Sequence, residues 1–178
     1  IVACLVGSEM CIRDSIGIGH VRWATHGIPN IINAHPHSSE KVSVVHNGII
    51  ENSDELKKDL EEKGFKFKSQ TDTEVITVLV TQFLENSKPL ESVFKTLKKL
   101  KGSFALGIIF KNFPDIIIGA RRGSPLAVGY SKEENYLGSD SYALKSMTNK
   151  ISYLDDGELC ILNLSLIHIS EPTRQATI

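Results

Sequence analysis

The feature that most constrains this chain is an apolar run, VSVVHNGII at positions 42–50, that contains Asn47-Gly48. The β-branched residues of this run predict a buried strand. Asn-Gly is also the strongest short signal for a hairpin, so a tight turn at these two residues is one interpretation. The other is a strand that stops with a side-chain amide beside an unshielded backbone N–H. Two such donors aimed at one point can hold the negative oxygen of a tetrahedral intermediate.

Polar segments on either side of this run favour the oxyanion interpretation. RWATHG at 22–27 and NAHPH at 33–37 precede it, and TDTE at 71–74 follows it. These segments supply a guanidinium, several imidazoles and a carboxylate. A fixed cation, an anion and an oxyanion cradle together indicate a pocket for a small zwitterion whose carbonyl is attacked.

The first half of the chain is expected to form strands and then helices. A short strand over 20–23 precedes a long loop over 24–40, and loops of this length inside a compact domain are usually functional. A helix begins at the capping residues Asn52-Ser53-Asp54 and ends at Gly64. A second helix, capped by Thr71 or Asp72, covers 74–85, and a third covers about 89–100.

The second half of the chain turns to β-structure. A short helical turn is expected at Ser139-Asp140, and Gly123-Ser124-Pro125 is expected to join two strands. Strands, then helices, then strands indicate an α+β layered domain. The later strands are expected over 103–110, 116–120, 126–130, 136–139, 151–154 and 158–162.

The composition excludes several classes of function. The 178 residues suffice for one compact domain, and a net charge of −1 attracts neither nucleic acid nor a membrane surface. No apolar stretch approaches the roughly 18–20 residues that span a bilayer. Three cysteines without CxxC spacing indicate neither a disulfide framework nor a zinc site, so a reducing cytoplasm fits best.

Four histidines resemble a metal cluster by their number alone. His35 and His37 flank Pro36, and no carboxylate lies at a spacing that would complete a metal site. Packing within the loop is therefore favoured over zinc binding. We therefore expect no metal and no cofactor. The histidines concerned are His26, His35, His37 and His46.

The two ends of the chain do not fit the pattern of the middle. Residues 1–15 and 165–178 carry no clear period, and both resemble translated sequencing-adapter read-through. We expect them to be non-native tails around a domain at 16–164, the alternative being genuine terminal tails. The chain also begins with Ile1 rather than Met, which is typical of a fragment.

Six blocks of sequence carry a resemblance to a known family. They follow in order as GHVRWATHG, NAHPHSS, VVHNGIIEN, SQTDTEVI, ARRGSPLAVG and NYLGSDSYAL. The chain resembles the glutaminase domains of the glucosamine-6-phosphate synthases (isomerising glutamine–fructose-6-phosphate aminotransferases), which are class II glutamine amidotransferases. The resemblance implies the αββα layered sandwich of the N-terminal-nucleophile hydrolases, here incomplete at its N-terminus. Relatives that make phosphoribosylamine or asparagine share mainly the Asn-Gly and Asp-Thr-Glu elements.

The resemblance also implies roles for the polar residues. The Asn47 side chain and the Gly48 N–H would form the oxyanion hole, Arg22 would pair with the α-carboxylate of glutamine, and Asp72 would accept from its α-ammonium. A guanidinium matches a carboxylate bidentately, which agrees with the role of Arg22. The expected pocket residues beside them are Trp23, Thr25, His26 and His35.

Two of these roles have simpler alternatives. Arg22 could form a surface ion pair, which contributes little stability. Asp72 could act only as the N-cap of the helix that follows it, although one geometry permits both roles.

The nucleophile of the family is not evident in this chain. The reaction requires a cysteine at the mature N-terminus, whose α-amine, with a pKa near 8, serves as the base. Residue 1 is Ile, and Cys4 and Cys11 lie too close to Arg22 and within the expected tail. Cys160 is expected to be a core thiol. Ser124 lacks the G-x-S-x-G context of a serine nucleophile, so we expect no glutamine turnover by this fragment.

Three functions are compatible with the sequence. The leading one is a glutaminase domain that releases ammonia from L-glutamine through a thioester, for glucosamine 6-phosphate synthesis from fructose 6-phosphate. The ammonia would pass to a sugar-phosphate isomerase domain downstream in a homodimeric, cytoplasmic enzyme. The second is a glutaminase domain for another acceptor, such as phosphoribosyl pyrophosphate. The third is a non-catalytic glutamine-binding module that lacks the nucleophile.

Overall fold

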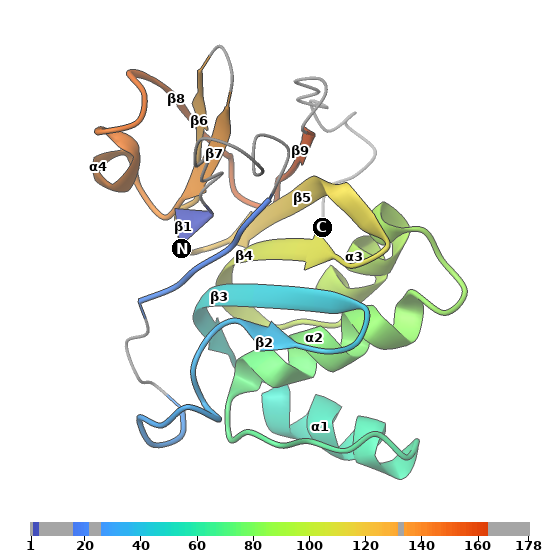
Figure 1. Ribbon diagram of the computed structural model, residues 1–178. Coiled ribbons are helices and arrows are strands. Elements are labelled where there is room, and N and C mark those ends of the chain that lie inside the picture. Colours follow the sequence, from blue (N-terminus) through green and yellow to red (C-terminus); the bar gives the residue numbers. More distant parts are fainter. Residues whose placement is uncertain (1, 4–15, 22–25, 132–133, 164–178) are drawn as a thin grey trace.

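The computed structural model of the chain describes residues 2–3, 16–21, 26–131 and 134–163 (Figure 1). Two antiparallel sheets face each other, and helices cover their outer sides. The order of layers is helix, sheet, sheet, helix. The α+β class and the αββα layering expected from the sequence are therefore confirmed.

The larger sheet has five strands in the order β2-β3-β4-β5-β9, and every pair is antiparallel. β3 and β4 pair over their whole lengths, from Val42 opposite Phe110 to Ile50 opposite Gly102. This continuous ladder fixes the position of the strand that carries Asn47-Gly48. The bounds are β2 (His37–Ser38), β3 (Val42–Ile50), β4 (Gly102–Phe110), β5 (Phe113–Arg122) and β9 (Leu159–Asn163).

Three helices cover one face of this sheet: α1 (Ser53–Glu62), α2 (Asp72–Phe83) and α3 (Pro89–Leu97). Their apolar sides and the facing strand residues form one core of fully buried side chains. α1 ends just before Gly64, which has a φ of +89° and terminates the helix as the sequence predicted. Members of this core include Val44, Leu60, Ile76, Leu97, Phe104 and Leu106.

The smaller sheet packs on the opposite face. Its strands, in the order β1-β7-β6-β8, are β1 (Val2–Ala3), β7 (Asn135–Gly138), β6 (Ala127–Tyr130) and β8 (Lys150–Tyr153). A second core lies between the sheets and contains Val45, Ala105, Ile117, Leu126, Val128 and Leu137.

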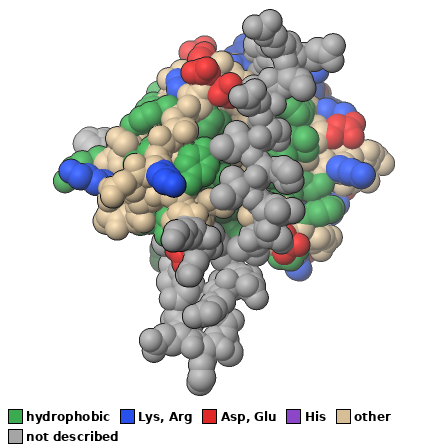
Figure 2. Space-filling view, turned by 90° about the horizontal axis from the view of Figure 1, so that it is seen from above, with side chains coloured by type: hydrophobic (Ala, Val, Ile, Leu, Met, Phe, Trp, Pro, Cys, Tyr) green, Lys and Arg blue, Asp and Glu red, His purple; other side chains and the backbone are tan. Residues whose placement is uncertain are grey.

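The short helix α4 (Ser141–Leu144) covers the outer side of this smaller sheet. Asp140 caps α4 by accepting a hydrogen bond from the Ala143 N–H, as Ser139-Asp140 predicted. Seen from above, hydrophobic side chains lie on both sides of the band of residues that the structure does not describe, and most charged side chains lie nearer the margin (Figure 2).

The strand expected over 42–50 is confirmed, whereas the hairpin interpretation and one other local expectation are wrong. Asn47-Gly48 does not form a hairpin, because β3 runs through both residues to Ile50 and stays paired with β4. His20 and Val21 are not part of a strand, and Val21 is 94% exposed. Positions 22–23 of that expected strand lie outside the described residues. Pairing with a distant strand overrides a local turn preference in the first case.

The domain boundaries remain predictions. Val2–Ala3, within the expected tail at 1–15, pair with Gly138 and Leu137 of β7. Positions 164–178 lie outside the described residues.

Candidate active site

The end of β3 and the start of α2 enclose a cavity of about 370 Å³. Five residues singled out in the sequence line it together: His26, His35, Asn47, Gly48 and Asp72. Its volume lies in the range of small-molecule sites. Arg22, Trp23 and Thr25 lie outside the described residues, so their roles stay predictions. The other lining residues are His20, His46, Ile49, Thr71 and Thr73.

Gly48 is required at its position by backbone geometry. Its φ of +135° is rarely adopted by other residues, and a Cβ atom there would lie 2.1 Å from the Ser103 carbonyl oxygen of β4. This φ lies outside the range typical of antiparallel strands, although Gly48 remains paired with Phe104 of β4. Asn47, beside it, is exposed. Both residues line the cavity, and a side-chain amide and a backbone N–H are hydrogen-bond donors.

Asp72 joins the strand to the helix at the cavity. Its Oδ2 accepts a hydrogen bond of 2.9 Å from the Ile50 N–H at the end of β3. The His26 Nδ1 lies 3.9 Å from Oδ2, and the His46 Nδ1 lies 3.8 Å from Oδ1. Asp72 is the first residue of α2, where the helix dipole favours a negative charge. Among the described residues no group donates a hydrogen bond to Oδ1.

Asp72 is therefore not only a cap. The N-cap residue of α2 is Thr71, and its side chain makes no capping hydrogen bond. The first turn is held instead by Glu74, which accepts from the backbone N–H groups of Lys68 and Ser69. The alternative that limited Asp72 to helix capping is wrong.

The Thr73 hydroxyl contacts two imidazoles at once. Its Oγ1 lies 3.0 Å from the His35 Nε2 and 3.1 Å from the His46 Nδ1. Burial lowers the pKa of His46 from 6.5 to about 4, the negative charge of Asp72 opposes this shift, and the nearby His26 and His37 add to it. His46 is therefore neutral at physiological pH.

The loop that carries His26 and His35 is fastened by Asn33, which is 1% exposed. The Asn33 Nδ2 donates to the Ile28 carbonyl at 3.0 Å and to the Gln70 Oε1 at 3.2 Å, and its Oδ1 accepts from the Gln70 N–H at 2.9 Å. Because Gln70 lies two residues before Asp72, this side chain ties the loop to the helix start.

Comparison with known proteins assigns the chain to a family. The glutamine amidotransferase domain family matches residues 20–146. The chain belongs to this family. Three proteins similar to this chain are named glutamine–fructose-6-phosphate aminotransferase [isomerizing]. They are 54% identical (Zymomonas mobilis), 53% identical (Mesorhizobium japonicum) and 50% identical (Gluconobacter oxydans), over 90%, 90% and 93% of this chain. The chain spans 26–27% of the length of these relatives.

Two solved structures share the fold of the amidotransferase domain. One is the glutamine phosphoribosylpyrophosphate amidotransferase from B. subtilis complexed with ADP and GMP, with a TM-score of 0.67 and 27% identity. The other, described as the allosteric regulatory enzyme of purine biosynthesis, gives 0.68 and 27%. Each likeness covers 81% of this chain and 32% of the other. The expected N-terminal-nucleophile type of fold is thereby confirmed.

The low pKa of His46 predicts that the amidotransferase domain loses stability in mild acid. The unfolded chain takes up a proton near pH 6.5 and the folded chain only near pH 4, so stability is full above pH 6.5 and falls between these values. The loss should be on the order of 2–3 kcal/mol by pH 4. Urea unfolding at pH 7 and pH 4.5 measures it. His46→Gln, which cannot titrate, should flatten the pH dependence, and an unchanged slope would contradict the assignment.

Cys160 is the only cysteine among the described residues, and it is unsuited to nucleophilic attack. It is buried in the core between the sheets, and that burial raises the pKa of its thiol to about 12. The expectation of a core thiol is confirmed. Cys4 and Cys11 lie outside the described residues.

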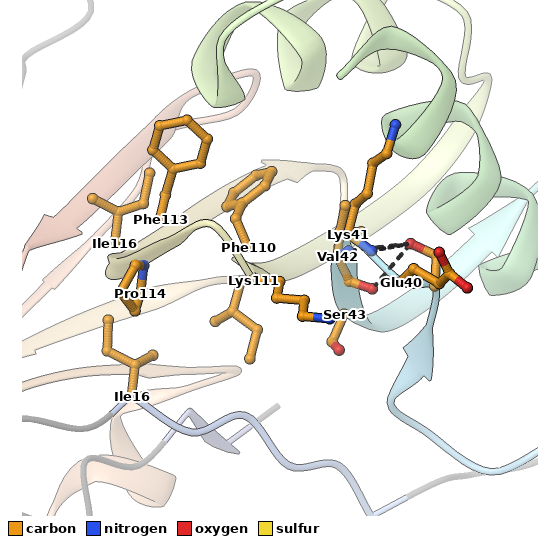
Figure 3. Close-up of a pocket in the computed structure, with 12 residues that line it drawn as sticks. Ile16, Glu40, Lys41, Val42, Ser43, Phe110, Lys111, Phe113, Pro114 and Ile116 are labelled. Carbon is orange, nitrogen blue, oxygen red and sulfur yellow. Dashed lines mark hydrogen bonds between the residues drawn. The ribbon is translucent and has the colours of Figure 1, made fainter. Parts of the chain in front are cut away.

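A second cavity, of about 430 Å³, lies at the opposite end of β3 (Figure 3). Ile16, Phe110, Phe113 and Pro114 line it together with polar strand ends such as Lys41. It contains no residue singled out in the sequence as a site residue. The candidate site is therefore the cavity at the other end of the strand, which the sequence-predicted residues line.

Sequence reasoning missed Asn33, His46 and Thr73 as parts of the site. His46 was weighed only as a metal ligand, and in the described part of the chain no three His, Cys, Asp or Glu residues are arranged to hold a metal ion. A usable signal was present, because His46 lies two residues before Gly48 and so shares its face of the strand. Within the described ranges, no helix is long and apolar enough to cross a membrane.

Proposed function

We propose that this amidotransferase domain binds L-glutamine and releases its side-chain nitrogen as ammonia. The observation that supports this most is the shared cavity in which Asp72, Asn47 and Gly48 meet at the junction of β3 and α2. A carboxylate at one side and amide donors at another suit an amino acid with a reactive carbonyl at its far end.

Each charged group of glutamine has a partner in this proposal. Asp72 accepts from the α-ammonium through its Oδ1, and Arg22 takes the α-carboxylate as a bidentate pair. Asn47 and Gly48 donate to the oxygen of the side-chain carbonyl as it becomes negative. Trp23, Thr25, His26 and His35 form the walls that hold the substrate.

The chemistry proceeds through a thioester. A thiolate attacks the side-chain carbonyl, the resulting oxyanion collapses, and the C–N bond breaks to release ammonia once its nitrogen is protonated. Water then hydrolyses the thioester to glutamate. The described residues provide binding and oxyanion stabilisation, and the family resemblance assigns the thiol to an N-terminal cysteine whose own α-amine accepts the proton.

The acceptor of the ammonia is proposed from the relatives. Those at 50–54% identity are named for fructose 6-phosphate, whereas the solved structure named for phosphoribosyl pyrophosphate is 27% identical. We therefore favour delivery of ammonia to a sugar-phosphate isomerase domain that makes glucosamine 6-phosphate. A homodimeric, cytoplasmic enzyme without a cofactor in this domain completes the proposal.

The 178-residue polypeptide should bind L-glutamate and L-glutamine and release no ammonia. Calorimetry and a coupled ammonia assay measure the two properties on one sample. Arg22→Ala should weaken binding by about 1.5–3 kcal/mol, the range for a charge-assisted hydrogen bond. Release of ammonia would contradict the assignment of the nucleophile, and failure to bind either amino acid would contradict the proposed pocket.

A further inference from the structure

We propose that the Thr73 hydroxyl is a positioning group for two histidines. It accepts a hydrogen bond from His46 and donates one to His35, and it thereby fixes the tautomers of both rings. Thr73 Oγ1 lies 3.1 Å from the His46 Nδ1 and 3.0 Å from the His35 Nε2. All three residues line the amidotransferase cavity. The inference deepens the proposed function and rests on it only for the effect on ligand binding.

The number of available protons limits how Thr73 can bond to the two rings. A hydroxyl can donate one hydrogen bond and accept others, and a neutral imidazole carries one N–H and one bare nitrogen. Thr73 can therefore donate to only one of the two rings. The other ring must place its own proton on the nitrogen that faces Thr73. The two rings cannot both accept from Thr73, so at least one of them donates to it, and we assign one ring as donor and the other as acceptor.

The direction of the coupling follows from Asp72. Its Oδ1 lies 3.8 Å from the His46 Nδ1, so its negative charge favours a proton on that nitrogen. His46 Nδ1–H then donates to Thr73 Oγ1, and the Thr73 O–H donates to His35 Nε2. His46 is left with a bare Nε2, and His35 carries its proton on Nδ1.

Burial makes this arrangement specific. His46 is 3% exposed and Thr73 is 1% exposed, so solvent has little access to the hydrogen bond between them, while the contact with His35 is partly buried. The hydroxyl also connects three walls of the cavity. His46 precedes Asn47 on β3, Thr73 follows Asp72 on α2, and His35 belongs to the loop. Removing the hydroxyl should therefore make the positions of Asn47 and Gly48 relative to Asp72 less fixed.

The test compares Thr73→Val, which keeps the shape and loses the hydroxyl, with Thr73→Ser, which keeps the hydroxyl. Ring-nitrogen NMR of histidine-labelled protein distinguishes protonated from bare nitrogens, and His35→Gln and His46→Gln assign the signals. The parent should show Nδ1–H at both rings, Thr73→Ser should keep this pattern, and in Thr73→Val the His35 proton should redistribute toward Nε2. A parent with the proton on His46 Nε2 or on His35 Nε2 overturns the proposal, even where Thr73→Val fails to fold.

Binding supplies the second readout. L-Glutamate affinity should fall about fivefold in Thr73→Val, the factor that one neutral hydrogen bond represents, and change less than about twofold in Thr73→Ser. Equal losses in both variants would contradict a role for the hydroxyl. Absence of L-glutamate binding by the parent would defeat the proposed function, while the parent's ring tautomers would still decide the inference about Thr73.

Discussion

Gly48→Ala should lower the free energy of unfolding by about 4 kcal/mol, and the variant should lose ligand binding wherever it still folds. The added Cβ would lie 2.1 Å from the Ser103 carbonyl oxygen and 2.9 Å from the Phe104 Cα. Both atoms belong to the backbone of β4, which is paired with β3 along its whole length and cannot yield locally. The φ of +135° adds conformational strain to this collision.

Gly64→Ala is the matched control for this prediction. Gly64 also has a positive φ, +89°, but a Cβ there would meet no atom within 4 Å. It should therefore cost only backbone strain, about 1–2 kcal/mol. Denaturant unfolding of both variants beside the parent separates collision from strain. Equal destabilisation would show that the contact with β4 does not set the identity of Gly48.

Asp72→Asn should weaken L-glutamate binding about 10- to 100-fold, because the α-ammonium would lose its charged partner in a buried site. The side chain is 5% exposed, so water screens the pair poorly. An asparagine oxygen can still accept from the Ile50 N–H, as the Asp72 Oδ2 does at 2.9 Å. The fold should persist while affinity falls, and calorimetry with parallel unfolding measurements tests both.

Glu74→Gln provides the control for Asp72→Asn. Glu74 lies in the same first turn of α2 and accepts from the N–H and hydroxyl of Ser69, but it does not line the cavity. Its neutralisation should cost stability through the helix dipole and the lost charge on those hydrogen bonds. Affinity for L-glutamate should stay within about twofold of the parent, since the variant removes no cavity charge. A large loss of affinity in Glu74→Gln would indicate a general effect of negative charge at the helix start.

The helices were predictable because their signals are local. Asn52-Ser53-Asp54 and Gly64 bracket α1, and Pro89 begins α3, as the sequence predicted. The polar motifs likewise gave Asp72, Asn47 and Gly48, which line one cavity. A shared pocket was inferred from the chemistry of these motifs and from the family resemblance, since no local pattern brings residue 72 beside residue 47.

Features that depend on distant partners were not predictable in the same way. The hairpin preference of Asn47-Gly48 loses to pairing with β4, whose residues lie much later in the chain. Thr73 looks like an ordinary helix residue until His35 and His46 approach it from a loop and a strand. Asn33 begins the NAHPH block, but its role was not predictable because it depends on hydrogen bonds to the distant Gln70.

A crystal structure of the polypeptide with bound L-glutamate would test most directly whether Asp72, Asn47 and Gly48 bind the two ends of one amino acid. The amino acid should occupy the cavity between β3 and α2, with its α-ammonium on the Asp72 Oδ1. Its side-chain carboxylate should accept from the Asn47 amide and the Gly48 N–H. A molecule bound outside this cavity, or bound with its two ends exchanged, would contradict the proposed binding mode.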